Sequence, residues 1–262
     1  MRSTSNPAFR NLPVGGGGYA GFNSSSAGFP GAASSYAGAP TTVGRPMTID
    51  DVVTKTGITL AILVATGAAT YLVPGAYVLA LPAALIGFVL ALVITFKKVV
   101  SPPLILAYAA VEGVFLGGIS GVFGSLFGPE IILQAVLGTV MVFGGMLVVY
   151  KTGAVKVTPR FTKWLIGAMI GVVGLMLINL IASFFTAGGL GLRDGGPLAI
   201  IFSLVCIGIA AFSFLLDFDA ADEAIRAGAP EKTAWYIAFG LTVTLVWLYL
   251  EILRLLSYFQ GD

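Results

Sequence analysis

Seven long apolar segments fill the chain from residue 47 onwards, and no other feature of the sequence constrains its fold as strongly. Most of them hold ~20 or more residues, enough for a helix to cross a hydrocarbon core of about 30 Å. Backbone N–H and C=O groups inside lipid have to pair within their own segment, so each span is expected to be helical. The sequence therefore predicts an all-α, multi-pass membrane bundle of seven transmembrane helices. The expected spans are 53–73, 75–96, 104–127, 131–150, 164–187, 197–217 and 233–258.

The composition excludes several classes of function. Only 10% of the residues are charged and 57% are hydrophobic, whereas a soluble domain carries about a quarter charged residues. A net charge of +2 gives no footprint for nucleic acid. The chain carries no phosphate loop, no nucleophile elbow and no EF-hand loop. We therefore expect neither an enzyme nor a resident cofactor. Because His is absent, proton sensing near neutral pH falls to carboxylates.

The first 46 residues differ from the rest of the chain. They are rich in Gly, Ser and Pro and include the run Gly15–Gly18. Such a segment buries too little apolar surface to offset the entropy lost on ordering. We expect a disordered cytoplasmic tail over 1–46 and a membrane domain over 47–262. At the junction, Thr48 followed by Asp50 and Asp51 is typical of a helix N-terminus.

The distribution of Lys and Arg predicts the orientation in the membrane. Of the 14 basic residues, all but Arg193 and Arg254 fall in the tail, in the first turn of span one, or in the loops after spans two, four and six. Positive charge gathers on the cytoplasmic side of membrane proteins. The N-terminus is therefore expected in the cytoplasm, and the protein in the cytoplasmic membrane. The C-terminus lies outside if span seven crosses fully, and inside if it only re-enters.

Four acids stand close together at the end of span six. Like charges on one helix face are mutually unfavourable and require protons, basic partners or a cation. Arg226 follows four residues after Asp222 and is a candidate neutralising partner. Their carboxylate oxygens also suit a hard divalent cation, so this run is a candidate metal site. The alternative is a solvated helix end. The acids are Asp217, Asp219, Asp222 and Glu223.

Two more acids lie inside apolar spans. Glu251 is flanked by large apolar residues in span seven, and Arg254 is placed for an i, i+3 ion pair with it. Glu112 in span three has no charged neighbour in sequence, and Asn179 of span five is a candidate polar partner. An intramembrane acid is by default a functional candidate. We expect Glu112 and Asn179 to line an ion path, with Glu251 either paired to Arg254 or facing water.

Glycines at four-residue spacing indicate close helix contacts in lipid. They occur in span three and again in span five. These glycine faces could serve packing inside one bundle, or they could form a dimer face or a hinge. The residues are Gly113, Gly117 and Gly121 in span three, and Gly167 and Gly171 in span five.

Taken together, these features resemble the Bax inhibitor-1-like membrane proteins, in particular a bacterial branch with a Gly-rich N-terminal tail. The resemblance covers about residues 47–258 and rests on the order of several motifs. These are the start of span one from Met47 to Gly57, the run Tyr108-Ala-Ala-Val-Glu-Gly113, and the segment from Ala229 through Leu256.

The resemblance implies a pH-sensitive calcium leak gated by two acids that share a proton, one from span six and one from span seven. Span seven would supply Glu251, where the family has Asp. Span six would supply Asp217 or Asp219. Two carboxylates in a low-dielectric site titrate as a coupled pair. A simple hairpin that turns near Gly228 nevertheless separates Asp217 from Glu251 by roughly 18 Å along the helix axis.

The leading hypothesis is thus a passive, proton-gated Ca²⁺ path through the bilayer. A proton-coupled transporter using the same acids is one alternative. A non-conducting regulator that binds another membrane protein, such as a membrane protease, is the other. The expected partners are lipid, Ca²⁺, protons and a membrane protein.

Overall fold

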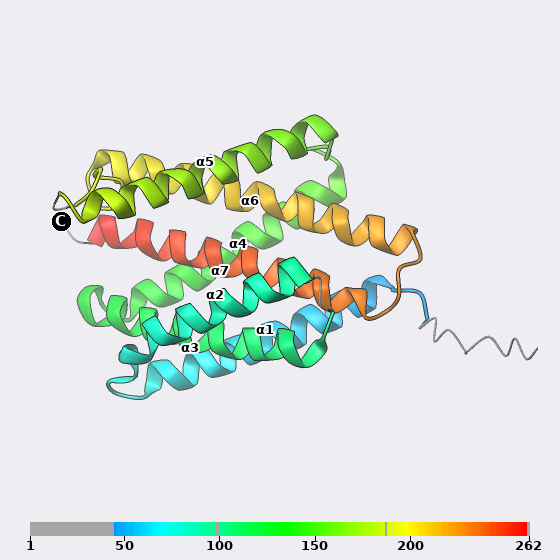
Figure 1. Ribbon diagram of the computed structural model, residues 1–262, viewed down its shortest axis with the longest axis horizontal. Coiled ribbons are helices and arrows are strands. Elements are labelled where there is room, and N and C mark those ends of the chain that lie inside the picture. The colour runs from blue at the N-terminus through cyan, green and yellow to red at the C-terminus, as the bar shows by residue number, and fades with distance from the viewer. Residues whose placement is uncertain (1–44, 98–99, 187, 261–262) are drawn as a thin grey trace, which may run out of the picture. The chain divides into compact units, whose positions relative to one another are not determined.

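Seven long helices make up almost all of the computed structural model, which describes residues 45–97, 100–186 and 188–260 (Figure 1). Each is long and apolar enough to cross a membrane, and the described residues contain no β-strand. The predicted all-α, multi-pass membrane fold is confirmed. The predicted tail falls almost wholly on residues 1–44, outside the described part. The elements are α1 (Ile49–Leu72), η2, a 3₁₀ turn (Ala76–Leu79), α2 (Ala80–Lys97), α3 (Pro102–Phe127), α4 (Glu130–Thr152), α5 (Pro159–Ser183), α6 (Pro197–Arg226) and α7 (Thr233–Gln260).

The helix start predicted at Thr48 is confirmed in detail. The Thr48 side chain accepts from the backbone N–H of Asp51, and the Thr48 N–H donates to the Asp51 carboxylate at 2.9 Å. This capping box satisfies two backbone donors that a helix N-terminus otherwise leaves unpaired. Helix α1 therefore begins at Ile49, earlier than the first apolar residue of the expected span.

Helix α6 runs past the end that hydropathy predicts for it. The expected span stops at residue 217, but the helix continues through the acidic run to Arg226. Hydropathy marks where the lipid-facing part ends, whereas Ala-rich acidic sequence continues a helix readily. The turn comes at Gly228, whose φ of +65° lies in the left-handed region that favours glycine.

Helix α7 occupies the centre of the bundle (Figure 1). It packs against α1, α3, α4 and α6, whereas α5 packs only against α6. Leu248 and Leu253 of α7 and Phe214 of α6 are completely buried. Polar groups on α7 are therefore the ones that this fold places inside the protein rather than against lipid.

The bundle has two ends, which we call the N-side and the C-side. The N-side holds the start of α1 and the loop between α6 and α7, where the Glu231 N–H donates to the Arg45 carbonyl at 3.0 Å. The C-side holds the start of α4 and the end of α7, joined by a 3.1 Å hydrogen bond from Gln260 to Gln134. Helix α7 therefore runs the full length of the bundle.

Only one of the two glycine faces packs against another helix. A Cβ at Gly113 would overlap the Thr66 hydroxyl of α1, and one at Gly117 would overlap the Gly67 carbonyl. Gly167 and Gly171 of α5 instead face open space. The close approach of α1 and α3 thus depends on Gly113 and Gly117, because any side chain there would push the two backbones apart.

Candidate functional site

Glu251 is the most deeply buried acid of the membrane domain. It is 2% exposed on α7, and Arg254 donates from Nη1 to its Oε1 at 2.9 Å. This is the i, i+3 ion pair that the sequence gave as one alternative for Glu251. A second guanidinium, that of Arg193 in the loop before α6, stands 3.6 Å from the same oxygen. We call Arg193, Glu251 and Arg254 the Glu251 triad. It lies toward the C-side and carries two positive charges and one negative charge.

The two carboxylate oxygens of Glu251 are not equally paired. Glu251 Oε2 is buried and makes no hydrogen bond within the described residues, while both arginines contact the other oxygen. Burial lowers the pKa of the Arg193 guanidinium, as does the neighbouring charge of Arg254, whereas Glu251 acts in the opposite direction. A loop cation is therefore held against a span carboxylate at the edge of the membrane domain. Sequence reasoning placed Arg193 in an outer loop but gave no signal that it reaches α7.

Asp217 lies at a different level of the bundle. Its carboxylate accepts a hydrogen bond from the Thr244 hydroxyl of α7 at 2.7 Å and lies beside Gly240 of the same helix. Glu251 stands about 10 Å farther along α7 than Thr244. The structure therefore does not bring Asp217 and Glu251 together. The offset of about 10 Å is shorter than the roughly 18 Å of a simple hairpin, but it has the same sense and keeps the two carboxylates apart.

The remaining acids of α6 diverge from Asp217. Asp222 accepts from the Tyr150 hydroxyl of α4 at 2.8 Å, and Arg226 pairs with it at 3.2 Å, so the expected neutralising partner is in place. Glu223 is exposed, and no hydrogen bond or ion pair joins Asp219 to another described residue.

The structure does not gather the four acids that were expected to bind a metal ion. No group of three or more His, Cys, Asp or Glu side chains within the described ranges is placed to hold a metal ion. Residues on a helix point outward every 100°, and here successive acids turn toward α7, toward α4 and into solvent. The residues of that expectation are Asp217, Asp219, Asp222 and Glu223.

Glu112 is a buried acid without a basic partner among the described residues. It is 8% exposed on α3, and its Oε2 makes no hydrogen bond there. The carboxylate lies against Gly87 of α2, where a Cβ would come within 2.7 Å of Oε1. Tyr108, one turn earlier, packs edge-on against Phe239 of α7. Glu112 therefore lies one turn along α3 from a residue that contacts α7, while its own carboxylate faces α2.

Asn179 does not partner Glu112. Its side-chain oxygen accepts from the Leu190 N–H at 2.8 Å and so organises the loop between α5 and α6. Helix α5 makes no contact with α3, so no rotation of the Asn179 side chain would bridge the distance. The structure thus does not make Asn179 the polar partner of Glu112.

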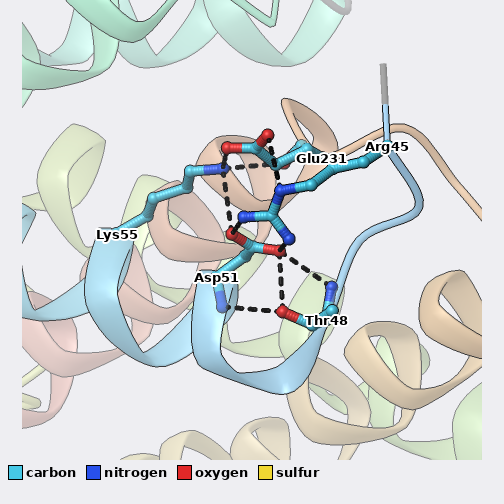
Figure 2. Close-up of polar contacts among 5 residues, drawn as sticks. All are labelled: Arg45, Thr48, Asp51, Lys55 and Glu231. Atoms are coloured by element: carbon cyan, nitrogen blue, oxygen red, sulfur yellow. Dashed lines mark hydrogen bonds and ion pairs between the residues drawn. The ribbon is translucent and has the colours of Figure 1, made fainter. Parts of the chain in front are cut away.

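A second charged cluster lies at the N-side (Figure 2). Lys55 of α1 is buried and contacts Glu231 of the α6–α7 loop at 3.0 Å and Asp51 at 3.9 Å. Arg45 reaches Asp51 at 2.7 Å and Glu231 at 3.3 Å. We call Arg45, Asp51, Lys55 and Glu231 the N-side network. It joins the start of α1 to a loop far away in sequence.

The network combines two positive and two negative charges, so it is electrically balanced. Lys55 also donates to the Glu231 backbone carbonyl at 2.9 Å and stands 6.0 Å above the ring of Trp235. The sequence identified Asp51 as a helix start and Lys55 as a charge near span one. It held no signal for Glu231, because the contact joins segments far apart along the chain.

One comparison with known proteins identifies a family. The model of the family described as "Bax inhibitor 1 like" matches residues 6–261. No curated protein matches the chain.

Proposed function

The chain belongs to the Bax inhibitor 1 like family, and from this premise we propose that it forms a pH-sensitive calcium leak in the cytoplasmic membrane, with its N-terminus in the cytoplasm. The path runs along α7, past Asp217 and Glu112 and then past the Glu251 triad. The observation that carries the proposal is that the central helix α7 carries the buried carboxylate of Glu251 and donates a hydrogen bond from Thr244 to the Asp217 carboxylate of α6, while Glu112 is buried on the neighbouring α3. A carboxylate at membrane depth is costly unless it is protonated, paired or wet.

The three acids differ in how they are balanced. Glu251 is held by two arginines, whereas Asp217 and Glu112 contact no basic side chain in the described part of the chain. Calcium takes oxygen ligands, and the stretch of α7 around residues 239–244 offers the Asp217 carboxylate and the Thr244 hydroxyl. A proton on Asp217 removes the negative charge that a passing cation meets.

The gate proposed here is a two-level arrangement rather than one shared proton. Asp217 is the acid that protonates without a competing guanidinium. Glu251 offsets the positive field of Arg193 and Arg254 toward the C-side. Without the charge of Glu251 those two guanidiniums are unopposed, which strengthens the barrier to a cation. The two levels thus act on a passing cation for different electrostatic reasons, and Asp217 is the level that responds to pH.

The deciding experiment is calcium influx into liposomes loaded with a calcium dye, measured from about pH 6 to pH 8. Asp217→Asn mimics the protonated acid. Its flux is therefore expected to be the same at every pH and to equal the flux of the wild type in the most acidic buffer. Glu251→Gln is expected to depress flux at every pH. Glu223→Gln, which neutralises an exposed acid on α6, the helix of Asp217, is the matched control. Wild-type protein that is folded and gives no flux at any pH refutes the leak.

A second candidate function rests on α5. This helix packs only against α6, and Gly167, Gly171 and Gly174 on it face open space. Small residues at this spacing let another membrane helix approach closely. On this reading the protein regulates a membrane protein, such as a membrane protease. Gly171→Leu would then abolish association with that partner and leave calcium flux unchanged.

A further inference from the structure

An apolar cavity of about 370 Å³ opens on the side of the bundle, in the half toward the C-side. Helices α3 and α7 form its floor, and α1 and α4 form its two walls. No residue of α1 contacts α4 in the described structure, so the space between them is open to the surrounding membrane. Residues from all four helices line it, including Val64, Ala68, Ser120, Val136, Val140 and Tyr249.

Three of the four hydroxyl groups that line this cavity already make hydrogen bonds within the protein, and the fourth is that of Tyr71. The Ser120 hydroxyl donates to the Leu116 carbonyl at 2.6 Å and meets the Tyr249 hydroxyl at 2.7 Å. The Thr139 hydroxyl donates to the Ala135 carbonyl at 2.7 Å. No charged residue lines the cavity. Water occupies a cavity where it finds two to four polar partners, so the walls favour a hydrocarbon occupant.

The length of the cavity matches one leaflet. Its lining on α1 runs from Leu60 to Tyr71, which is about 16 Å of helix. That is close to half of a hydrocarbon core of about 30 Å.

A more polar hollow continues the cavity at the C-side. It shares Tyr71 and Gly117 with the cavity and is otherwise lined by the loop around Pro74, by Ser125 and by Pro129. No charged side chain lines this hollow either. An apolar slot one leaflet long that ends in an uncharged polar hollow matches a phospholipid chain and its ester region.

We propose that this cavity binds one acyl chain of a membrane phospholipid, with the Ser120–Tyr249 pair at its base. Lipid outside the protein is as apolar as the cavity, so the driving force is van der Waals contact with the fixed walls. The inference does not depend on calcium conduction. It assigns the α1–α4 opening to a lipid rather than to an ion or a protein.

The test uses the full chain in phosphatidylcholine liposomes that carry a trace of phosphatidylcholine with a diazirine on one acyl chain. After photolysis, mass spectrometry locates the adducts. Ordinary surrounding lipid labels exposed residues such as Val173, which is 56% exposed. Ser120 and Tyr249 are 5% and 8% exposed, so only an inserted chain labels them or their neighbours on the floor.

We expect adducts on the floor in the wild-type protein and their loss to background in Ala68→Phe and in Val140→Phe, which fill the opening from opposite walls. Val173→Phe on α5 is the matched control and is expected to keep the floor adducts. Floor adducts that are missing from the wild type overturn the proposal. So do floor adducts that persist in both filled variants. Two variants are used because either one alone could fail to fold, and the wild-type result stands without them.

Discussion

The N-side network and the Glu251 triad both bring ionised side chains into contact, but their charges add up differently. The network holds two positive and two negative groups, which cancel. The triad holds two guanidiniums on one oxygen of a single carboxylate. A cluster whose charges cancel produces little electric field at long range, which suits a structural role. An unbalanced one projects charge onto whatever passes it. The two clusters thus differ in charge balance, and the proposed function assigns the ion path to the unbalanced one.

The largest expected effect of breaking the network comes from Lys55→Met. Lys55 is only 10% exposed and holds both an ion pair and a backbone hydrogen bond with Glu231. Its loss is expected to lower the free energy of unfolding by about 2–3 kcal/mol, measured by denaturant titration in detergent micelles. The pH profile of calcium flux is expected to stay unchanged.

Lys97→Met is the control for that measurement, because Lys97 is exposed at the end of α2 and makes no ion pair among the described residues. A shifted pH profile in Lys55→Met would contradict a purely structural network. It would place the N-side cluster on the ion path together with the span acids.

Arg193→Gln tests the unbalanced cluster and is expected to act on flux rather than on stability. Arg193 reaches Glu251 from a loop and is 32% exposed at its side chain, so it contributes little to folding. Removing its charge lowers the barrier to a cation, and calcium flux near pH 7 is expected to rise on the order of 5-fold, equivalent to about 1 kcal/mol.

Arg226→Gln is the matched control for Arg193→Gln, since Arg226 is also paired to one acid but lies at the N-side and is 75% exposed at its side chain. Equal flux in Arg193→Gln and wild type would show that the triad's net charge does not act on the permeating ion.

The sequence predicts the helices well because the signals are local. Seven apolar segments, the Thr48–Asp51 cap and the turn at Gly228 each depend on a few neighbouring residues, and each is present, although α1 begins earlier and α6 ends later than hydropathy predicts. The separation of Asp217 and Glu251 also follows from the sequence, because helical rise along a hairpin fixes it. The resemblance suggested a shared proton, whereas the axial arithmetic argued against direct contact.

The partners of the charged residues are not predictable in the same way. Arg193 reaches Glu251 through a loop whose course depends on several glycines with positive φ, Gly188, Gly189, Gly191 and Gly195. Lys55 and Glu231 meet only once all the intervening helices are packed. Asn179 was assigned to Glu112 because both are polar and intramembrane. The sequence identifies the polar residues that require partners inside the membrane, but the packing of the helices decides which residues they contact.

Glu112→Gln tests an acid that has no basic partner among the described residues, in contrast to the ion-paired acids of the two clusters. Glu112 has no basic partner in the described part of the chain, and one carboxylate oxygen there is without a hydrogen bond. Replacing it with a neutral isostere removes a charge that the membrane interior opposes. The free energy of unfolding is expected to rise by about 0.5–1 kcal/mol, measured in the same micelles. A loss of stability would instead reveal that the ionised carboxylate is held by solvent or a bound ion.

Arg45→Gln is expected to have the smallest effect, and its salt dependence separates the two halves of the N-side network. Arg45 is 57% exposed at its side chain, against 10% for Lys55, although both contact Asp51 and Glu231. The screening length falls from about 10 Å at 0.1 M salt to about 3 Å at 1 M, and screening acts on exposed pairs far more than on buried ones. The destabilisation by Arg45→Gln is therefore expected to be smaller than that by Lys55→Met at low salt and to vanish at high salt, while the Lys55→Met loss persists. Were both losses to vanish together, the network would be a surface feature, and its balance of charge would carry no more structural weight than the isolated Arg226–Asp222 pair.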